Sequence, residues 1–136
     1  MNETEKYLEA QKAKVEPFRQ KFPTLFSHLQ YIDCEEGWYP LIEDLCEVIE
    51  GYVKYNVPEE LKDQVYFSQI KQKFGELRVH MNHWIDYVQG AITMAEAYST
   101  RVCEKCGEKG QTYNIRNWLS TLCPKHYEEE LNRKYK

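Results

Sequence analysis

Two short pairs of metal-binding residue types near the end of the chain constrain its fold more than any other feature. Cys103 and Cys106 are separated by two residues, sixteen residues follow, and Cys123 and His126 are again separated by two. Zinc is held by four sulfur and nitrogen ligands in a tetrahedron, and two such pairs can supply all four. The spacing therefore predicts a structural Zn²⁺ site whose ligands are all protein side chains.

The residues beside these pairs predict the local fold. Gly107 can adopt the positive φ that closes a tight turn after the first pair. Pro124 suits the first turn of a helix, which would carry Cys123 and His126 on one face and continue to about Tyr135. Between the pairs we expect a short hairpin that packs apolar residues around the metal, namely Tyr113, Ile115, Trp118 and Leu122. This order of turn, hairpin and helix resembles the treble-clef class of zinc motif over residues 101–136.

The same motif argues against catalysis. Treble clefs also occur in nucleases. A resemblance of this chain to those nucleases would imply a catalytic histidine on the hairpin and a second metal site with an open position. Residues 107–122 contain no histidine, and Glu108 is their only acid. A metal with four protein ligands has no position left for a catalytic water. We therefore expect a non-enzymatic protein.

The rest of the sequence predicts an α+β fold that is mainly helical. Helical periodicity covers residues 4–21, 24–31, 41–55 and 82–100, with Thr4, Thr24 and Asn82 as N-caps. Two of these helices have a strong apolar stripe, formed by Leu41, Leu45, Val48, Ile49, Tyr52 and Val53 in one and by Ile85, Val88, Ala91, Ile92, Ala95 and Tyr98 in the other. We expect a single domain over residues 1–136, with a helical body over 1–100 and a zinc-binding lobe over 101–136.

Residues 65–81 have a different pattern. Leu77, Val79 and Met81 alternate with polar residues, which indicates a strand. The preceding residues alternate less regularly, and Gly75 separates the two runs. The sequence predicts a β-hairpin that turns near residues 73–75, with a helix through Gln72 as the alternative.

Charge and hydropathy limit the classes of function. Residues 1–61 carry 13 acids and 6 bases, whereas residues 62–136 carry 9 acids and 12 bases. The acidic first half argues against general affinity for the DNA backbone. No apolar run is long enough to span a membrane, and the first residues lack the basic and apolar pattern of a signal peptide, so we expect none. We expect a cytoplasmic protein, in which paired cysteines bind metal rather than form disulfides.

The remaining cysteines and histidines show no catalytic pattern. Cys46 lies on a strongly apolar helix and is expected to be buried. Cys34 is followed by Glu35 and Glu36, which disfavour a thiolate. The three histidines outside the metal pairs are expected to be structural or surface residues, namely His28, His80 and His83.

Three stretches of the chain are distinctive together. They are Gly37-Trp-Tyr-Pro-Leu-Ile42, Ile70-Lys-Gln-Lys-Phe-Gly-Glu-Leu-Arg78, and the final Cys-x2-Cys-Gly with Trp-Leu-Ser-Thr-Leu-Cys-x2-His. Their order and spacing resemble a family of small proteins encoded by bacteriophages and prophages, over roughly residues 30–127. The resemblance implies a phage origin, the cytoplasm of the host cell, and an α+β body with a zinc lobe. It carries no assigned activity and no catalytic residues.

The second stretch places positive charge and an aromatic ring on the predicted hairpin. Lysine and arginine bind phosphate or carboxylate, and aromatic rings stack on bases. A pocket for an anion or a nucleotide between the hairpin and the turn at residues 37–41 is one interpretation. A hairpin whose basic residues are simply solvated is the other. The candidate ligand-binding residues are Trp38, Tyr39, Lys71, Lys73, Phe74 and Arg78.

These observations predict a non-enzymatic, zinc-stabilised binding protein. Its partner would be a host protein or a small anionic ligand such as a nucleotide, and a phage protein of this kind would sequester a nucleotide signal or block a host protein in host defence. The alternative is a nucleic-acid-associated regulator whose zinc lobe contacts phosphates. The residues for such contacts are Arg101, Lys105, Lys109, Arg116 and Lys125.

Overall fold

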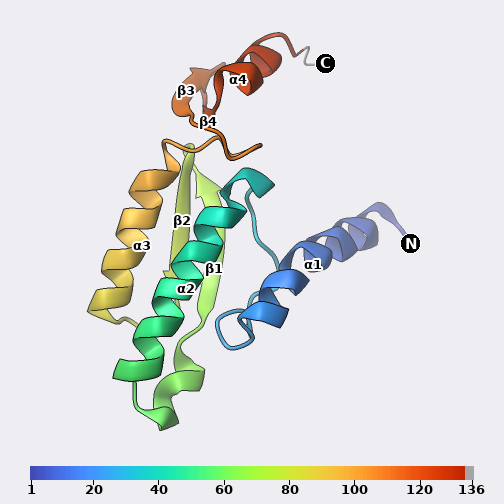
Figure 1. The fold of residues 1–136 in the computed structure, drawn as a ribbon. Helices are drawn as coiled ribbons and strands as arrows, with labels where there is room; N and C mark the ends of the chain where they lie inside the picture. The colour runs from blue at the N-terminus through green and yellow to red at the C-terminus, as the bar shows by residue number, and fades with distance from the viewer. Residues whose placement is uncertain (134–136) are drawn as a thin grey trace.

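The computed structural model describes residues 1–133 and confirms the α+β class, with four α-helices and two antiparallel hairpins in this part of the chain (Figure 1). In chain order the elements are α1 (Glu3–Lys21), η1 (Glu36–Trp38), α2 (Tyr39–Asn56), η2 (Glu59–Gln64), β1 (Phe67–Lys73), β2 (Glu76–Met81), α3 (Asp86–Ser99), β3 (Gln111–Ile115), β4 (Trp118–Leu122) and α4 (Pro124–Leu131). None of the helices in this range combines the length and the apolar character needed to cross a bilayer.

Helices α2 and α3 pack against each other, and α3 lies along β2 (Figure 1). Both helices bury one face at helical spacing, because every third or fourth residue of that face is apolar. Their buried residues join those of the first hairpin in the main core, which includes Ile42, Leu45, Ile49, Phe67, Ile70, Leu77, Val79, Val88 and Ile92. Two residues of the predicted apolar stripes are not buried: Val48 is 45% exposed and Tyr98 is 55% exposed.

The hairpin β1–β2 turns where the sequence predicts. Phe74 and Gly75 form a two-residue connection in which both have positive φ, 55° and 78°. Turns of this kind match the twist of the flanking strands, so the alternative of a helix through Gln72 is wrong. The pairing register shifts between Phe67 and Gln69, which explains why the first strand lacks a clean alternation.

The helix predicted over residues 24–31 does not form. These residues make isolated turns, although Leu25, Phe26 and Leu29 are buried as the pattern requires. The side chain of Arg19 donates from Nε to the carbonyl of Phe26 (3.2 Å) and from Nη2 to that of Leu29 (2.5 Å). These bonds satisfy carbonyl groups that a helix would otherwise use, and they stabilise a turn instead.

Two helix starts also differ from the prediction. Asn2, not Thr4, caps α1, and its Oδ1 accepts a hydrogen bond from the backbone N–H of Glu5 (2.8 Å). Helix α3 begins at Asp86 rather than after Asn82, because the side chain of Asn82 donates to the carbonyl of Gln64 instead of capping a helix.

The elements β3, β4 and α4 form a C-terminal lobe (residues 101–131) at the turn end of the first hairpin (Figure 1). Hydrogen bonds between distant residues join the lobe to the body, among them those from Gly37 N–H to the Glu104 carbonyl (2.7 Å), from the Trp38 indole to the Val102 carbonyl (2.8 Å), and from the Thr121 hydroxyl to the Gly75 carbonyl (2.5 Å). Helix α4 ends at Leu131, short of the predicted end near Tyr135, which lies outside the described residues.

Candidate metal centre and ligand cleft

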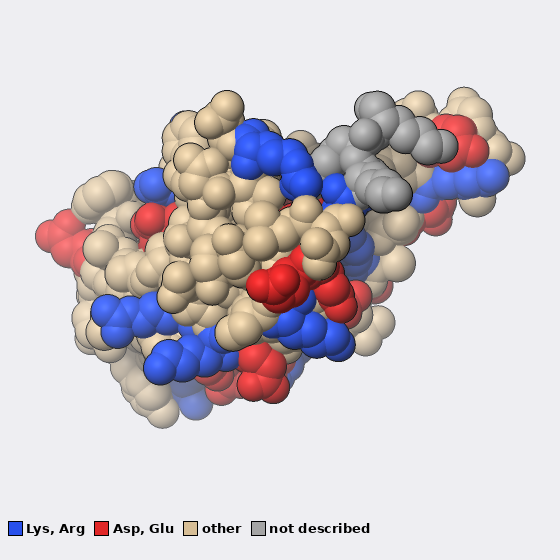
Figure 2. Space-filling model, turned by 90° about the horizontal axis from the view of Figure 1, so that it is seen from above, with Lys and Arg blue, Asp and Glu red and all other residues tan. Residues whose placement is uncertain are grey.

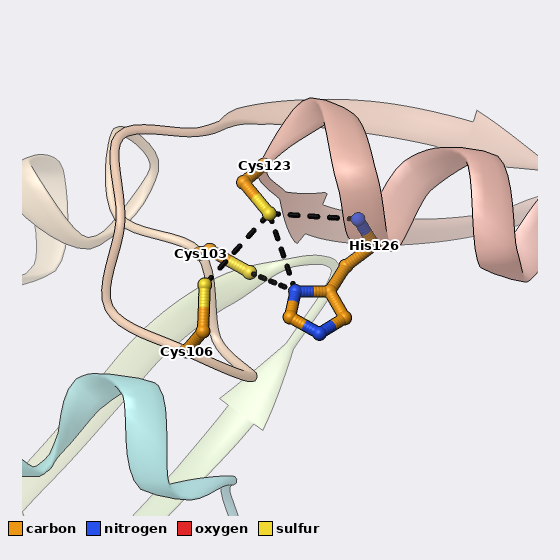
Figure 3. Close-up of side chains that lie close together, drawn as sticks. All are labelled: Cys103, Cys106, Cys123 and His126. Carbon is orange, nitrogen blue, oxygen red and sulfur yellow. Dashed lines mark hydrogen bonds between the residues drawn. The ribbon is translucent and has the colours of Figure 1, made fainter.

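The four predicted ligands lie together between the first turn of α4 and the loop that precedes β3 (Figure 3). Their ligand atoms are all within 4.8 Å of one another. Nδ1 of His126 is 3.5 Å from Sγ of Cys103 and 3.2 Å from Sγ of Cys123, and the sulfurs of Cys106 and Cys123 are 3.7 Å apart. Three sulfurs and one nitrogen at these separations can hold a metal ion.

Local backbone structure positions each pair of ligands. In the first pair, the N–H of Gly107 donates to the carbonyl of Cys103 (2.9 Å), and Gly107 has a φ of 84°. This is the tight turn that the sequence predicts. In the second pair, Cys123 is the N-cap of α4 and Pro124 follows in the first turn, so that the N–H of His126 points at the Cys123 sulfur (3.5 Å).

The thiols of the cluster differ in their electrostatics: the pKa of Cys123 is shifted toward the ionised sulfur that a metal needs, and the pKa of Cys106 is shifted away from it. At Cys106 a backbone hydrogen bond at Glu108 lowers the pKa, but burial and the neighbouring thiols outweigh it and raise the pKa. Burial raises the pKa of the Cys123 thiol, but hydrogen bonds from the backbone and ring of His126 and from the neighbouring thiols outweigh this effect and lower the pKa to about 7. A carboxylate oxygen of Glu129 lies 3.8 Å from Nε2 of His126, on the side of the ring away from the cluster. Such a carboxylate helps to orient a metal-binding imidazole.

The second hairpin packs differently from the prediction in one respect. Ile115 and Leu122 are buried next to Cys103 and Cys123 in a small cluster, with Tyr113 and Tyr127 at its edge. The rings of these two tyrosines are stacked at 3.7 Å. Trp118, which was expected to pack around the metal, is 65% exposed. Its pairing with Ile115 places it on the same face of the hairpin as the buried residues of the cluster, but at the end where the hairpin turns.

The isolated cysteines and histidines behave as the sequence suggests. Cys34 and Cys46 are buried, and burial, followed by nearby carboxylates, raises the pKa of both thiols far above the usual range. The side chains of the three other histidines, His28, His80 and His83, are exposed. These residues do not form a second metal cluster within residues 1–133.

The six predicted ligand-binding residues do not surround a common cavity. Trp38 is fully buried beneath the lobe, and its indole N–H is bonded to the chain. Phe74 projects from the hairpin turn with the Lys73 ammonium 5.5 Å from its ring centre, and Arg78 lies 3.9 Å from Glu76. The turn at Gly37 is covered instead by the loop that holds Cys103 and Glu104, whose carbonyls lie against Gly37.

A cleft of about 760 Å³ lies instead between α1, the segment before η1, and the C-terminal lobe. Its lining includes Tyr7, Gln11, Lys14, Asp33, Cys34, Glu35, Gln72, Glu104, Lys105, Ile115, Trp118 and Ser120. No local pattern in the sequence indicates this cleft, because its walls come from parts of the chain that are far apart in sequence.

The cleft brings together cations, carboxylates and aromatic rings. Lys14 has no ion-pair partner in residues 1–133, and Lys105 lies 3.4 Å from Glu130. The Glu104 carboxylate accepts a hydrogen bond from the N–H of Glu35 (3.0 Å). Burial nevertheless raises the pKa of Glu104 to about 7, and the negative charges of Glu35 and Asp33 add to this effect.

On the face shown in Figure 2, lysines and arginines are interspersed with acids and neutral residues and form no continuous basic surface. The guanidinium of Arg116 donates to the carbonyls of Glu130 (3.2 Å) and Leu131 (2.9 Å), so it supports the end of α4.

No protein-family model, curated protein or solved structure matches this chain. The resemblance to phage proteins therefore stays a prediction.

Proposed function

We propose that this chain is a zinc-stabilised binding protein without catalytic activity, and that its ligand lies in the cleft between α1 and the C-terminal lobe. The observation that carries the proposal is the closed Cys₃His cluster next to this cleft. A metal with four protein ligands has a structural role, because no position remains for a substrate or water. The lobe that it orders supplies one wall of the cleft.

The donor set and its spacing support zinc as the metal. A tetrahedral Zn²⁺ with Zn–S near 2.3 Å and Zn–N near 2.0 Å places neighbouring sulfurs roughly 3.8 Å apart and sulfur and nitrogen roughly 3.5 Å apart. The observed S–S separation of 3.7 Å and one S–N separation of 3.5 Å fit these values, and the other S–N separation is shorter, 3.2 Å. Thiolate-rich tetrahedral sites select zinc over the harder divalent cations.

The side chains of the cleft suit a nucleotide better than they suit a simple anion. Lysine side chains can bind phosphate, exposed aromatic rings can stack on a base, and carboxylates can accept hydrogen bonds from ribose hydroxyls or from the amino group of a base. Lys14, Trp118 and Asp33 offer these three chemistries from three separate elements. A purely anionic ligand would leave the carboxylates unfavourably close to it.

A nucleotide-binding cleft would suit the predicted role of a phage protein in host defence. In the host cytoplasm, a protein that holds a nucleotide in a cleft without converting it would remove a signal used in host defence. Thiolate ligands also favour a reducing compartment, since oxidation of the cysteines would destroy the metal site.

Calorimetric titration with adenine nucleotides (mono-, di-, tri- and cyclic phosphates) tests the function. We expect saturable binding of at least one of them, weakened roughly tenfold by Trp118→Ala and by Lys14→Ala. Trp84→Ala and Lys54→Ala are matched controls, since both residues are exposed and lie outside the cleft. Absence of binding by every nucleotide, or equal losses in the control variants, would contradict the proposal.

A further inference from the structure

A second concave surface lies on the outer side of the helix pair, away from the nucleotide cleft. It is a groove of about 590 Å³ between α2 and α3, and it shares no lining residue with the cleft. Its walls are Leu41, Asp44, Leu45, Val48, Tyr87, Gly90, Ala91, Met94, Ala95 and Tyr98. All but two of these residues, Asp44 and Gly90, have apolar or aromatic side chains.

The groove exposes large apolar side chains of a kind that is normally buried against a neighbouring element. Met94 is 71% exposed and Tyr87 56% exposed, although both lie on a well-formed helix. With Ala91 and Tyr98 they recur at intervals of four, three and four residues along α3. On α2, Leu41 and Val48 face the same groove one heptad apart. Apolar residues at this spacing on two adjacent helices form a seat for a third helix.

The charge around the groove indicates which helix fits. Helices α2 and α3 carry six carboxylates and a single lysine, Lys54, and no lysine or arginine lines the groove. Glu43 and Glu47 are paired with Lys21 of α1, whereas Asp44 in the groove wall has no ion-pair partner in residues 1–133. Asp44 is the one charged residue that lines the groove, so a second copy bound through the same groove would bring another Asp44 and no cation to it. This pairing leaves both carboxylates without a positive partner.

We propose that the α2–α3 groove binds an amphipathic helix of a partner protein, whose apolar stripe is bordered by lysine or arginine. The apolar stripe would fill the space between Val48 and Met94, and the basic border would lie against Asp44. The partner contributes the positive charge that the groove lining lacks. This binding surface is independent of the nucleotide cleft, because the two sites have separate walls.

Fluorescence anisotropy with two labelled model peptides tests the inference. Both have the length of α3 (14 residues) and the same leucine stripe, and the polar positions are lysine in one and glutamate in the other. We expect saturable one-to-one binding of the lysine peptide, weaker at high salt, and much weaker binding of the glutamate peptide. Met94→Lys and Asp44→Asn should each weaken binding of the lysine peptide, the first by roughly tenfold.

Leu8→Lys is the matched control for Met94→Lys, because it adds the same charge at another exposed apolar residue, on α1. It should leave peptide binding unchanged. Equal affinity for both peptides, no saturable binding, or the same loss in Leu8→Lys would overturn the proposal. Sedimentation analysis tests whether a second copy of this chain fills the groove instead. A dimer that dissociates in Met94→Lys would show that it does, and this result would also overturn the proposal. Nucleotide binding by Met94→Lys should be unaffected in every case.

Discussion

The cysteines of this chain have two kinds of environment, and Cys46 differs clearly from the three cysteines of the metal cluster. Cys103, Cys106 and Cys123 face one another and His126, and their thiolates are available to a metal. Cys46 is fully buried on the inner face of α2. Burial, followed by the charges of Glu50, Glu43 and Glu47, raises the pKa of the Cys46 thiol above its ordinary value of 9.0. It acts as a small apolar side chain.

Cys46 therefore gives stability a dependence on alkaline pH. The unfolded chain releases this proton near pH 9.0, whereas the folded chain retains it. The contribution of Cys46 to the free energy of unfolding is complete below that pH and falls above it by about 1.4 kcal/mol per pH unit. Denaturant unfolding in reducing buffer should show a less steep alkaline decline for Cys46→Ala than for the wild type. Parallel declines would mean that the folded chain ionises this thiol as readily as the unfolded chain.

At the scale of elements, the contact between η1 and the metal-binding loop decides how the lobe is attached. The backbone of Gly37 lies so close to this loop that an added Cβ would be 2.1 Å from the Cys103 carbonyl oxygen and 2.4 Å from that of Glu104. Only glycine leaves room for the hydrogen bond from Gly37 N–H to Glu104 and for the bond from Trp38 to Val102.

Gly37→Ala should therefore displace the loop from the body. We expect the free energy of unfolding to fall by about 3 kcal/mol, because the clash is with backbone atoms that cannot rotate away. Hydrogen exchange at Gly37 and Trp38 should quicken. Gly51→Ala is the matched control, since an added Cβ meets nothing within 4 Å on α2, and it should stabilise the protein by about 0.5–1 kcal/mol. If both variants unfolded like the wild type, the close approach would be unimportant for stability.

The sequence predicted those features of the elements that depend on local chemistry. The intervals between the metal ligands, the glycine in the hairpin turn and the periodicity of α2 all act over a few residues, and each appears in the structure where it was expected. The turns at residues 24–31 were mistaken for a helix because their stability comes from Arg19, on another element. The cleft and the α2–α3 groove depend on segments that meet only after folding, so no local pattern indicated them.

At the scale of the whole molecule, residues 1–133 form two hydrophobic clusters of very different size. The larger joins α1, α2, α3 and the first hairpin. The smaller has four buried residues, and two of them are the metal ligands Cys103 and Cys123. Ile115 and Leu122 alone bury too little apolar surface to offset the conformational entropy of ordering the lobe. The lobe therefore depends on its metal, whereas the body has a core of its own.

Removal of the metal should unfold the lobe and leave the body folded. Binding to zinc-finger peptides supplies about 10–16 kcal/mol at neutral pH, and this energy is lost when a chelator removes the ion. Native mass spectrometry should show one Zn²⁺ per chain before chelation and none in Cys123→Ser. Hydrogen exchange after chelation should rise across β3, β4 and α4, while Ile42, Ile49 and Leu77 in the main core stay protected. Zinc added back should restore protection of the lobe.

A uniform rise in hydrogen exchange over the whole chain would show that lobe and body unfold as one cooperative unit. Unchanged exchange would show that the lobe folds without metal. If the lobe unfolds alone, nucleotide binding at the cleft should be lost with it, whereas peptide binding at the α2–α3 groove should persist, because the groove is built from the body.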